Sequence, residues 1–258
     1  MRKKIMNHYR QGTLLKALAK RLSWLLRADN SKLQIGYRNI TNKIRYGFSA
    51  PRYTETIWVY GNKIDRMIFW SLLVNKYHSI KNTSALVINS DWPFSEAINI
   101  SEFLQSEYVK QYWWTKEFVP KYAGITRIVI CIEHWVKGIT WEDAGAYDFM
   151  EKHIEYLGRP IDNCANRKDI IERYKNLDII FEQAKKERAL RLPGESDFHL
   201  KRKDGQNKGF VHIDSNSELI WTGPGQHRFA IAYILKIPFP VHIGLVHLNS
   251  LPYLNNFR

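Results

Sequence analysis

The chain has 258 residues, of which 45% are hydrophobic and 14% aromatic, so it suits one large domain and is not a disordered protein. Its formal net charge of +14 is uneven. Residues 1–50 contain twelve Lys and Arg but one acid, a charge of +11, whereas the other 208 residues carry 27 bases and 24 acids, a charge of +3. The basic character therefore belongs to an N-terminal arm, and its expected partner is a polyanion, either lipid head groups or nucleic acid.

The arm, residues 1–47, contains a leucine-rich segment at 13–27, TLLKALAKRLSWLLR. Its leucines recur at helical spacing and its charged residues fall largely off that stripe, which predicts a basic amphipathic helix. The segment is too short and too charged to cross a bilayer, which takes roughly 20 apolar residues. Two interpretations stay open: the helix lies on an anionic membrane surface, or it packs its leucines on the body of the protein. DNA binding is a third, smaller option.

Several elements are predicted between the arm and residue 135. Residues 48–65, GFSAPRYTETIWVYGNKID, are typical of a short strand followed by a turn. Ser84–Asn89 predicts a short buried strand, and Ser95 precedes a helix that runs to about Tyr112. The β-branched, apolar run Gly124–Trp135 predicts another strand.

Two helices are predicted next. Thr140 is the expected N-cap of a helix that ends near Gly158. The pattern over Asp169–Arg191 predicts the clearest helix of the chain, and the polar stretch 195–208 predicts a loop. The expected apolar face of the second helix consists of Ile170, Ile171, Tyr174, Leu177, Ile180, Phe181 and Ala184.

The segment Gly209–Val246 is the most informative. It predicts a strand (VHI), a polar turn, a second strand (LIW), a glycine turn (TGPGQHR), a helix (FAIAYILK) and a last strand (PVHIGLV). A glycine turn that opens into a helix favours anion binding, because free backbone N–H groups and the helix dipole meet there. Arg228 offers donors that suit phosphate oxygens, and His227 can bind phosphate or shuttle a proton.

The box Gly225-Gln226-His227-Arg228, its helix and the following I-P-x-P-V strand resemble the core of the ParB/sulfiredoxin superfamily. The resemblance covers residues 205–247 and extends to 48–65. It implies an α/β fold, with a small mixed-sheet core in a domain spanning 48–258 and a mostly helical insert at about 93–194. The layout is most similar to an uncharacterised ParB-like group that carries such an insert.

The resemblance also implies ATP or CTP as the ligand, with Mg²⁺ carried by the nucleotide. Its phosphates would be held by Gly223, Gly225, Gln226, His227 and Arg228. Gln226 stands where a sulfiredoxin has its reactive cysteine, so sulfinic-acid reduction is disfavoured. The two cysteines, Cys131 and Cys164, form no CxxC pair and fit a reducing cytoplasm.

Three residues are candidates for catalysis. His227 lies in the box. Asp214 is a candidate to hold Mg²⁺ or accept a hydroxyl proton if its strand ends beside the glycine turn; its alternative role is to form the turn. Glu55 is placed by resemblance near the first strand, where related serine kinases carry a base, and Asp65 is the other local acid.

Four further residues are candidates for a substrate pocket: Arg52, Tyr53, His212 and Glu195. The odd spacing of His242 and His247 puts them on opposite faces of a strand, so no transition-metal site is expected.

The preferred hypothesis is an ATP-dependent phosphotransferase that acts on a hydroxyl of a small molecule or of a glycan or lipid precursor. It would be cytoplasmic, with the arm peripheral on the inner face of the membrane. One alternative is a ParB-like, DNA-associated nucleotide-binding protein or nuclease, although no helix-turn-helix follows the box and the body is nearly neutral. Another is a binding module without catalysis.

Overall fold

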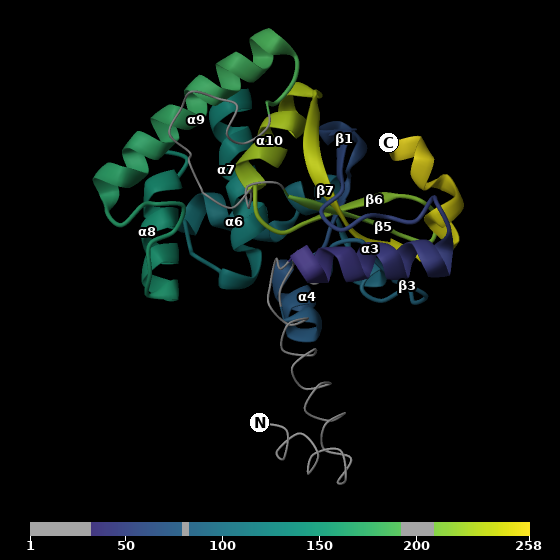
Figure 1. Ribbon diagram of the computed structural model, residues 1–258. Helices are drawn as coiled ribbons and strands as arrows, with labels where there is room; N and C mark the ends of the chain where they lie inside the picture. Colours follow the sequence, from purple (N-terminus) through teal and green to yellow (C-terminus); the bar gives the residue numbers. More distant parts are fainter. Residues whose placement is uncertain (1–31, 79–82, 192–208) are drawn as a thin grey trace, which may run out of the picture.

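The computed structural model describes residues 32–78, 83–191 and 209–258 (Figure 1). The predicted helix at 13–27 and the candidate Glu195 lie outside these ranges. Within them the chain is mixed α/β. The strands are β1 (Thr56–Tyr60), β2 (Arg66–Met67), β3 (Leu86–Ile88), β4 (Ile98–Asn99), β5 (Phe210–Ile213), β6 (Leu219–Thr222) and β7 (Pro238–His247). The helices are α3 (Lys32–Tyr46), α4 (Trp70–Tyr77), α5 (Ile100–Leu104), α6 (Glu107–Thr115), α7 (Ala123–Lys137), α8 (Ala146–Leu157), α9 (Arg167–Glu187) and α10 (Gln226–Leu235).

The strands of the described ranges form one mixed sheet, in which six follow the order β1-β7-β5-β6-β2-β4 and β3 pairs with β7 off this path. The long strand β7 has β5 parallel on one side; on the other it pairs antiparallel with β1 and then parallel with β3. Strands β5 and β6 form an antiparallel hairpin in which Phe210 lies opposite Thr222 and Ile213 opposite Leu219. The strands, turns and helix predicted over Gly209–Val246 are thus confirmed, as is the strand and turn within 48–65.

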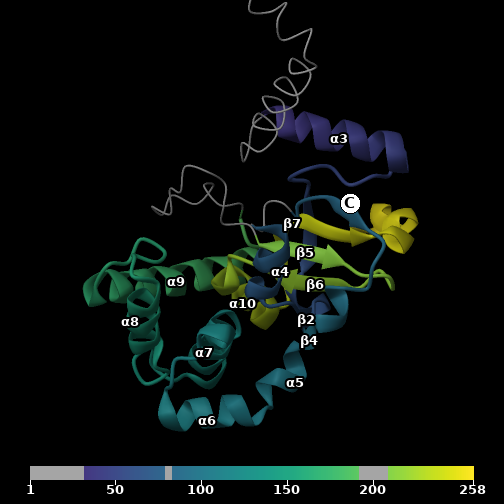
Figure 2. The ribbon, with the colours of Figure 1, turned by 90° about the horizontal axis from the view of Figure 1, so that it is seen from below.

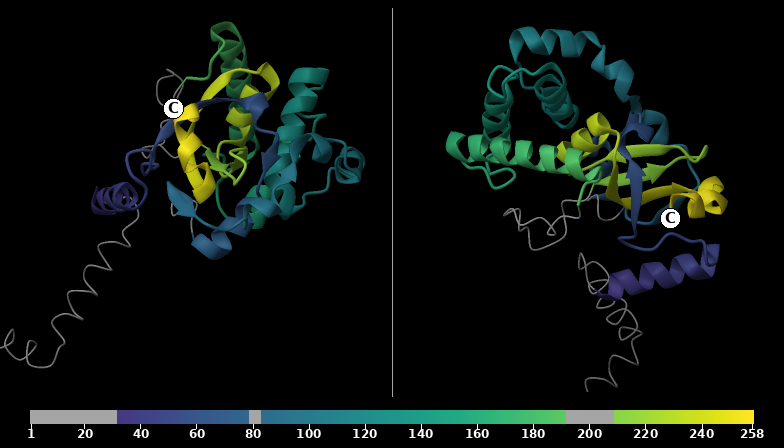
Figure 3. Two further views of the ribbon diagram at one scale, coloured as in Figure 1. Left: turned by 90° about the vertical axis from the view of Figure 1, so that its right-hand side faces the viewer. Right: turned by 90° about the horizontal axis from the view of Figure 1, so that it is seen from above.

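Helix α10 connects the sheet to the rest of the helices. It packs against α7 and α9, and the turn that follows β1 crosses it at Gly61. Figures 1 and 2 show α7, α8 and α9 gathered beside α10, whereas Figures 2 and 3 show α3 apart from them, on the other side of the sheet. None of the helices in the described ranges is long and apolar enough to cross a membrane.

The run Gly124–Trp135 is not a strand, and that prediction is wrong. It forms most of helix α7, which ends at Gly138 in the left-handed conformation. The helix is buried over most of its circumference, from Ile125 to Cys131 without a break, because α10 and the other helices surround it. Consecutive buried positions leave no polar–apolar alternation in this run, and its β-branched residues are typical of strands.

Other boundaries differ in smaller ways. The helix expected between Ser95 and Tyr112 is divided into α5 and α6, because Asn99 and Ser106 each cap a separate helix start. Helix α8 begins at Ala146 and not next to Thr140, whose hydroxyl instead accepts from the backbone of Asp143 in a preceding turn. Helix α9 confirms the helix expected at Asp169–Arg191, with shifted ends. Strand β3 confirms the strand in Ser84–Asn89, but its residues are half-buried.

Candidate functional site

The glycine turn joins β6 to α10. Gly223 and Gly225 have φ angles of 87° and 91°, in the left-handed region that glycine tolerates without strain. The Gln226 side chain braces the turn, since its Nε2 donates to the Gly223 carbonyl over 2.7 Å. Gly225 is the N-cap of α10 and offers no side chain to the helix. The first-turn N–H groups therefore keep the partial positive charge of a helix N-terminus.

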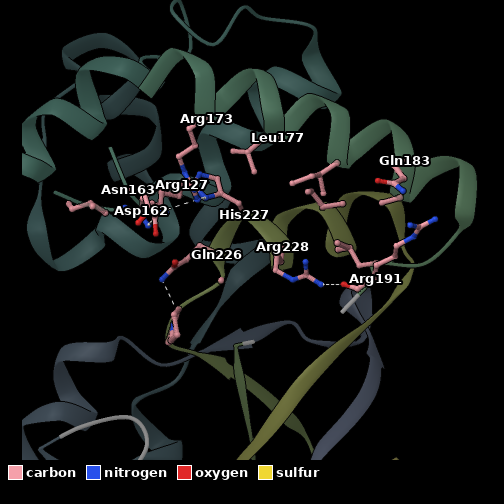
Figure 4. Close-up of a pocket in the computed structure, with 18 of the residues that line it drawn as sticks. Arg127, Asp162, Asn163, Arg173, Leu177, Gln183, Arg191, Gln226, His227 and Arg228 are labelled. Atoms are coloured by element: carbon pink, nitrogen blue, oxygen red, sulfur yellow. Dashed lines mark hydrogen bonds and ion pairs between the residues drawn. The ribbon is translucent and has the colours of Figure 1, made fainter. Parts of the chain in front are cut away.

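A cavity of about 280 Å³ lies between the glycine turn and α9 (Figure 4). One wall is the segment Gly223–Arg228 with Ile231, and Trp70 lies at its edge. The opposite wall belongs to the insert predicted at about 93–194. It consists of Arg127, His153, Ile161, Asp162, Asn163, Arg173, Leu177, Ile180, Gln183, Ala184, Glu187 and Ala189–Arg191. The cavity thus holds four arginines and two carboxylates from the described residues.

Arg228 extends from the first turn of α10 along the cavity (Figure 4). Its Nη2 donates to the backbone carbonyl of Arg191. Burial lowers the pKa of Arg228 to about 10, so the guanidinium remains charged at neutral pH. Among the residues that the structure describes, no carboxylate forms an ion pair with it, so this charge stays available to an anion.

His227 is buried beneath the turn, with 4% of its surface exposed. Its ring meets Tyr174 edge-on at 5.6 Å, and its Nδ1 lies 3.4 Å from Nη2 of Arg173. Because a guanidinium only donates, Nδ1 accepts and the proton resides on Nε2, which has no hydrogen-bond partner in the described part of the chain. Burial, then Arg173 and Arg127, lower its pKa well below the usual range. His227 is therefore neutral at pH 7.

Arg127 of α7 and Arg173 of α9 form a second charged group of the cavity, which sequence reasoning missed. Both contact Oδ2 of Asp162, at 3.4 Å and 3.3 Å. His153 also contacts Arg127 and is neutral, because burial and then Arg127 lower its pKa to about 4. One signal was present in the sequence: Arg127 interrupts an apolar run, and a charge inside a buried segment marks a site or a buried ion pair.

Asp214 and His212 lie away from the glycine turn. Strand β5 does neighbour β6, but the pairing is antiparallel, so the end of β5 lies at the opposite end of the hairpin from Gly223. Asp214 accepts from the backbone of Asn216 and Glu218 and pairs with Arg66 at 2.6 Å, which fits the turn-forming alternative. His212 is fully buried, and its Nδ1 accepts from the Leu245 backbone.

Glu55 and Arg52 line a different cavity, of about 880 Å³, beside β1. Glu55 is buried and held by Arg258, whose Nε donates to it over 2.8 Å. Burial acts to raise the Glu55 pKa, but hydrogen bonds from Arg258 and Arg52 outweigh it, and the net shift is downward. Asp65 also lines this cavity and accepts from Asn99 and Ser101.

Tyr53 packs beside α3, and its backbone N–H donates to the side chain of Asn39. The two histidines of β7 are engaged separately: His242 contacts Thr56, and His247 accepts from the Asn249 backbone. In the described ranges no three His, Cys, Asp or Glu side chains gather in a way that could hold a metal ion.

Of the predicted site residues, the structure therefore brings together Gly223, Gly225, Gln226, His227 and Arg228 around one cavity. The chain matches no family model, no curated protein and no solved structure.

Proposed function

We propose that this chain binds a nucleotide, or a similar phosphorylated molecule, with a phosphate at the N-terminus of α10. The observation that carries the proposal is Arg228, a half-buried guanidinium with no carboxylate partner among the described residues, beside a glycine-capped helix start. Backbone N–H groups, the helix dipole and a fork of guanidinium donors together favour phosphate.

The ParB/sulfiredoxin-like core is part of the same proposal. The order β1, turn, then β5, β6, glycine turn, α10 and β7 supports it, as does an insert whose described elements include five helices, α5–α9. The resemblance to that superfamily implies that the ligand is ATP or CTP.

The residues of the cavity suit the phosphate end of a nucleotide better than they suit Mg²⁺. Its volume of about 280 Å³ is at the lower end of the ≈ 300–1,000 Å³ of ligand sites, enough for the phosphates. Its two carboxylates, Asp162 and Glu187, both contact arginines, so the described residues offer Mg²⁺ no carboxylate that is not already shared.

Phosphoryl transfer to a small-molecule or glycan-type hydroxyl extends the proposal. With Glu55 and Asp214 elsewhere, no described carboxylate is placed as a base at the glycine turn, and His227 has its acceptor nitrogen facing Arg173. Catalysis would then rest on positioning and on charge stabilisation by arginines. The same observation favours a second candidate function, a nucleotide-binding module without catalysis.

The test is thermal unfolding of the full chain with ATP, CTP or inorganic phosphate, each with and without Mg²⁺. A ligand at about 100 times its Kd stabilises the folded state by ~2.7 kcal/mol. We expect a shift for the wild type and for Lys185→Ala, an exposed α9 control outside the cavity, and none for Arg228→Ala. No shift with any of these anions, or an equal shift in Arg228→Ala, would refute the site.

Phosphate transfer is measured separately, as ATP turnover in the presence of candidate acceptors. A stable complex without turnover would support the binding module.

We also propose that α3 contacts an anionic membrane surface, together with the helix predicted at 13–27. The polar side of α3 is bonded to the body, since Asn42 donates to the carbonyls of Pro51 and Ala85. Its apolar side is exposed, up to 79% at Ile44. This exposed stripe consists of Tyr37, Ile40 and Ile44, with Phe48 just beyond the helix. Basic residues dominate this part of the sequence, which complements anionic lipid.

A further inference from the structure

The pair Arg127 and Arg173 carries more positive charge than its surroundings neutralise. Their side chains are 8% and 14% exposed, and Asp162 is the only carboxylate with which either forms an ion pair in the described ranges. The neighbouring imidazoles, His153 and His227, are both neutral at pH 7. A surplus buried charge is costly unless something pairs with it.

The distances from this arginine pair to its neighbours are also longer than those of a close ion pair. Arg127 and Arg173 approach Asp162 at 3.4 and 3.3 Å, and Arg127 reaches His153 at 3.2 Å. Elsewhere in the same molecule arginine–carboxylate pairs close to 2.6 Å, at Arg66–Asp214, and to 2.8 Å, at Arg258–Glu55. The closer range is that of a well-formed charge-assisted hydrogen bond.

Within residues 32–78, 83–191 and 209–258, three buried nitrogens of this region have no hydrogen-bond partner: Nε of Arg127, Nε of Arg173 and Nε2 of His227. Most buried polar atoms in proteins are hydrogen-bonded, so three such atoms around one cavity indicate that it was built for an additional polar group. A purely structural ion pair would leave fewer donors unused.

The pair is close to the glycine turn without being part of it. Figure 4 shows Arg127, Arg173 and Asp162 on one side of His227 and Arg228 on the other. Arg173 touches the His227 ring at 3.4 Å, and all four arginines line the same cavity. Two cationic positions thus flank His227. One is Arg228 after the glycine turn, and the other is the pair Arg127 and Arg173.

We propose that Arg127 and Arg173 form a second anion subsite, so that the ligand carries two anionic groups. A phosphate binds at the glycine turn and Arg228, and a second phosphate or a carboxylate binds at the arginine pair. This inference rests on the proposed phosphate site and adds the class of molecule that the site selects: a compact, doubly anionic phosphate ester or the polyphosphate of a nucleotide.

The test uses three small probes at constant ionic strength, with binding to the full chain measured by calorimetry. Ethyl phosphate has one anionic group, phosphoglycolate replaces its methyl group by a carboxylate, and ethylene glycol bisphosphate carries two phosphates. Because hydrogen bonds to charged groups are the strong ones, we expect the two doubly anionic probes to bind the wild type about tenfold more tightly or better. The comparison between them separates carboxylate from phosphate at the second subsite.

The variants separate the two subsites. Arg173→Met should remove the advantage of the doubly anionic probes and leave the Kd of ethyl phosphate unchanged within about threefold. Arg228→Ala should weaken all three probes, and Lys185→Met, a charge-matched α9 control outside the cavity, should change none. Equal binding of the three probes to the wild type, or retained discrimination in Arg173→Met, would overturn the second subsite. Binding of no probe to the wild type would overturn the phosphate site as well.

Asp162→Asn keeps the inference testable if Arg173→Met does not fold. Asp162 has a φ angle of 53°, which asparagine tolerates well, and the substitution removes the one carboxylate that pairs with Arg127 and Arg173 among the described residues. We expect tighter binding of phosphoglycolate and an unchanged Kd for ethyl phosphate. A structural ion pair predicts the opposite outcome, lower stability with no gain in affinity.

Discussion

Gly61 is the position where the turn after β1 lies directly on the backbone of α10. A Cβ atom at this position would be 2.3 Å from the carbonyl carbon of Ala232 and 2.4 Å from the backbone nitrogen of Tyr233. Carbon atoms in contact prefer a separation of about 3.5–4.0 Å. Gly61→Ala must therefore move two backbones apart by about 1 Å, because no flexible side chain can give way.

We expect this variant to be strongly destabilised. Extra methylenes in a packed core cost about 1–3 kcal/mol, and a clash between backbones belongs at the upper end, about 3 kcal/mol. For a domain of this size, 1 kcal/mol corresponds to roughly 2–4 °C in Tm, so Tm should fall by about 6–12 °C.

The assay is thermal unfolding followed by far-UV circular dichroism. Gly36→Ala is the matched control, since Gly36 lies inside α3 and a Cβ there would meet nothing within 4 Å. Alanine is favoured over glycine in a helix by about 1 kcal/mol, so the control should be as stable as the wild type or slightly more stable. A Tm for Gly61→Ala within about 2 °C of the wild type would refute the packing argument.

Three further predictions concern other parts of the molecule. Burial lowers the pKa of His212 to about 3, whereas the same group in the unfolded chain has a pKa near 6.5 and binds a proton between these values. His212 alone should therefore cost about 2 kcal/mol of stability from pH 7 to pH 5, in addition to the losses from His153 and His227. The free energy of unfolding measured with urea should show this loss, and His212→Leu should reduce it. An equal pH dependence of stability in the wild type and the variant would contradict the assignment of the loss to His212. Burial raises the pKa of Cys131, so native protein should resist iodoacetamide and urea-unfolded protein should react, as read by mass spectrometry. Ile44→Glu should weaken sedimentation with phosphatidylserine vesicles severalfold, whereas Tyr156→Glu, exposed on α8, should not; equal losses would argue against α3 as the contact.

The strands and the helix between Gly209 and Val246 were predictable because residues at the ends of each element set its boundaries. Glycine, proline and polar residues separate each apolar run between Gly209 and Val246, and the chain turns at each of them. The glycine turn needed no long-range information, because left-handed φ angles at Gly223 and Gly225 follow from residue type and spacing.

The rest of the candidate site depends on pairing and packing that a single sequence does not display. The role considered for Asp214 required β5 to end beside the glycine turn. Strand β5 does pair with β6, but the pairing is antiparallel, so Asp214 lies at the far end of the hairpin. Arg127 was hidden in a run that resembled a strand, because α7 is buried without a break from Ile125 to Cys131. Arg173 lies on helix α9 and is not one of the residues of its predicted apolar face, yet its side chain contacts His227 of α10.

The two walls of the cavity have separate origins in the chain. The wall at α10 follows β6 directly in the chain, whereas the wall at α7 and α9 belongs to the helical stretch between β4 and β5. A ligand held by both would act as a clamp between them, slowing amide exchange in α9 even though it touches only one side of that helix. If phosphate binds as proposed, substitutions in α7 and α9 would change which molecule is selected without altering the proposed phosphate site at the glycine turn.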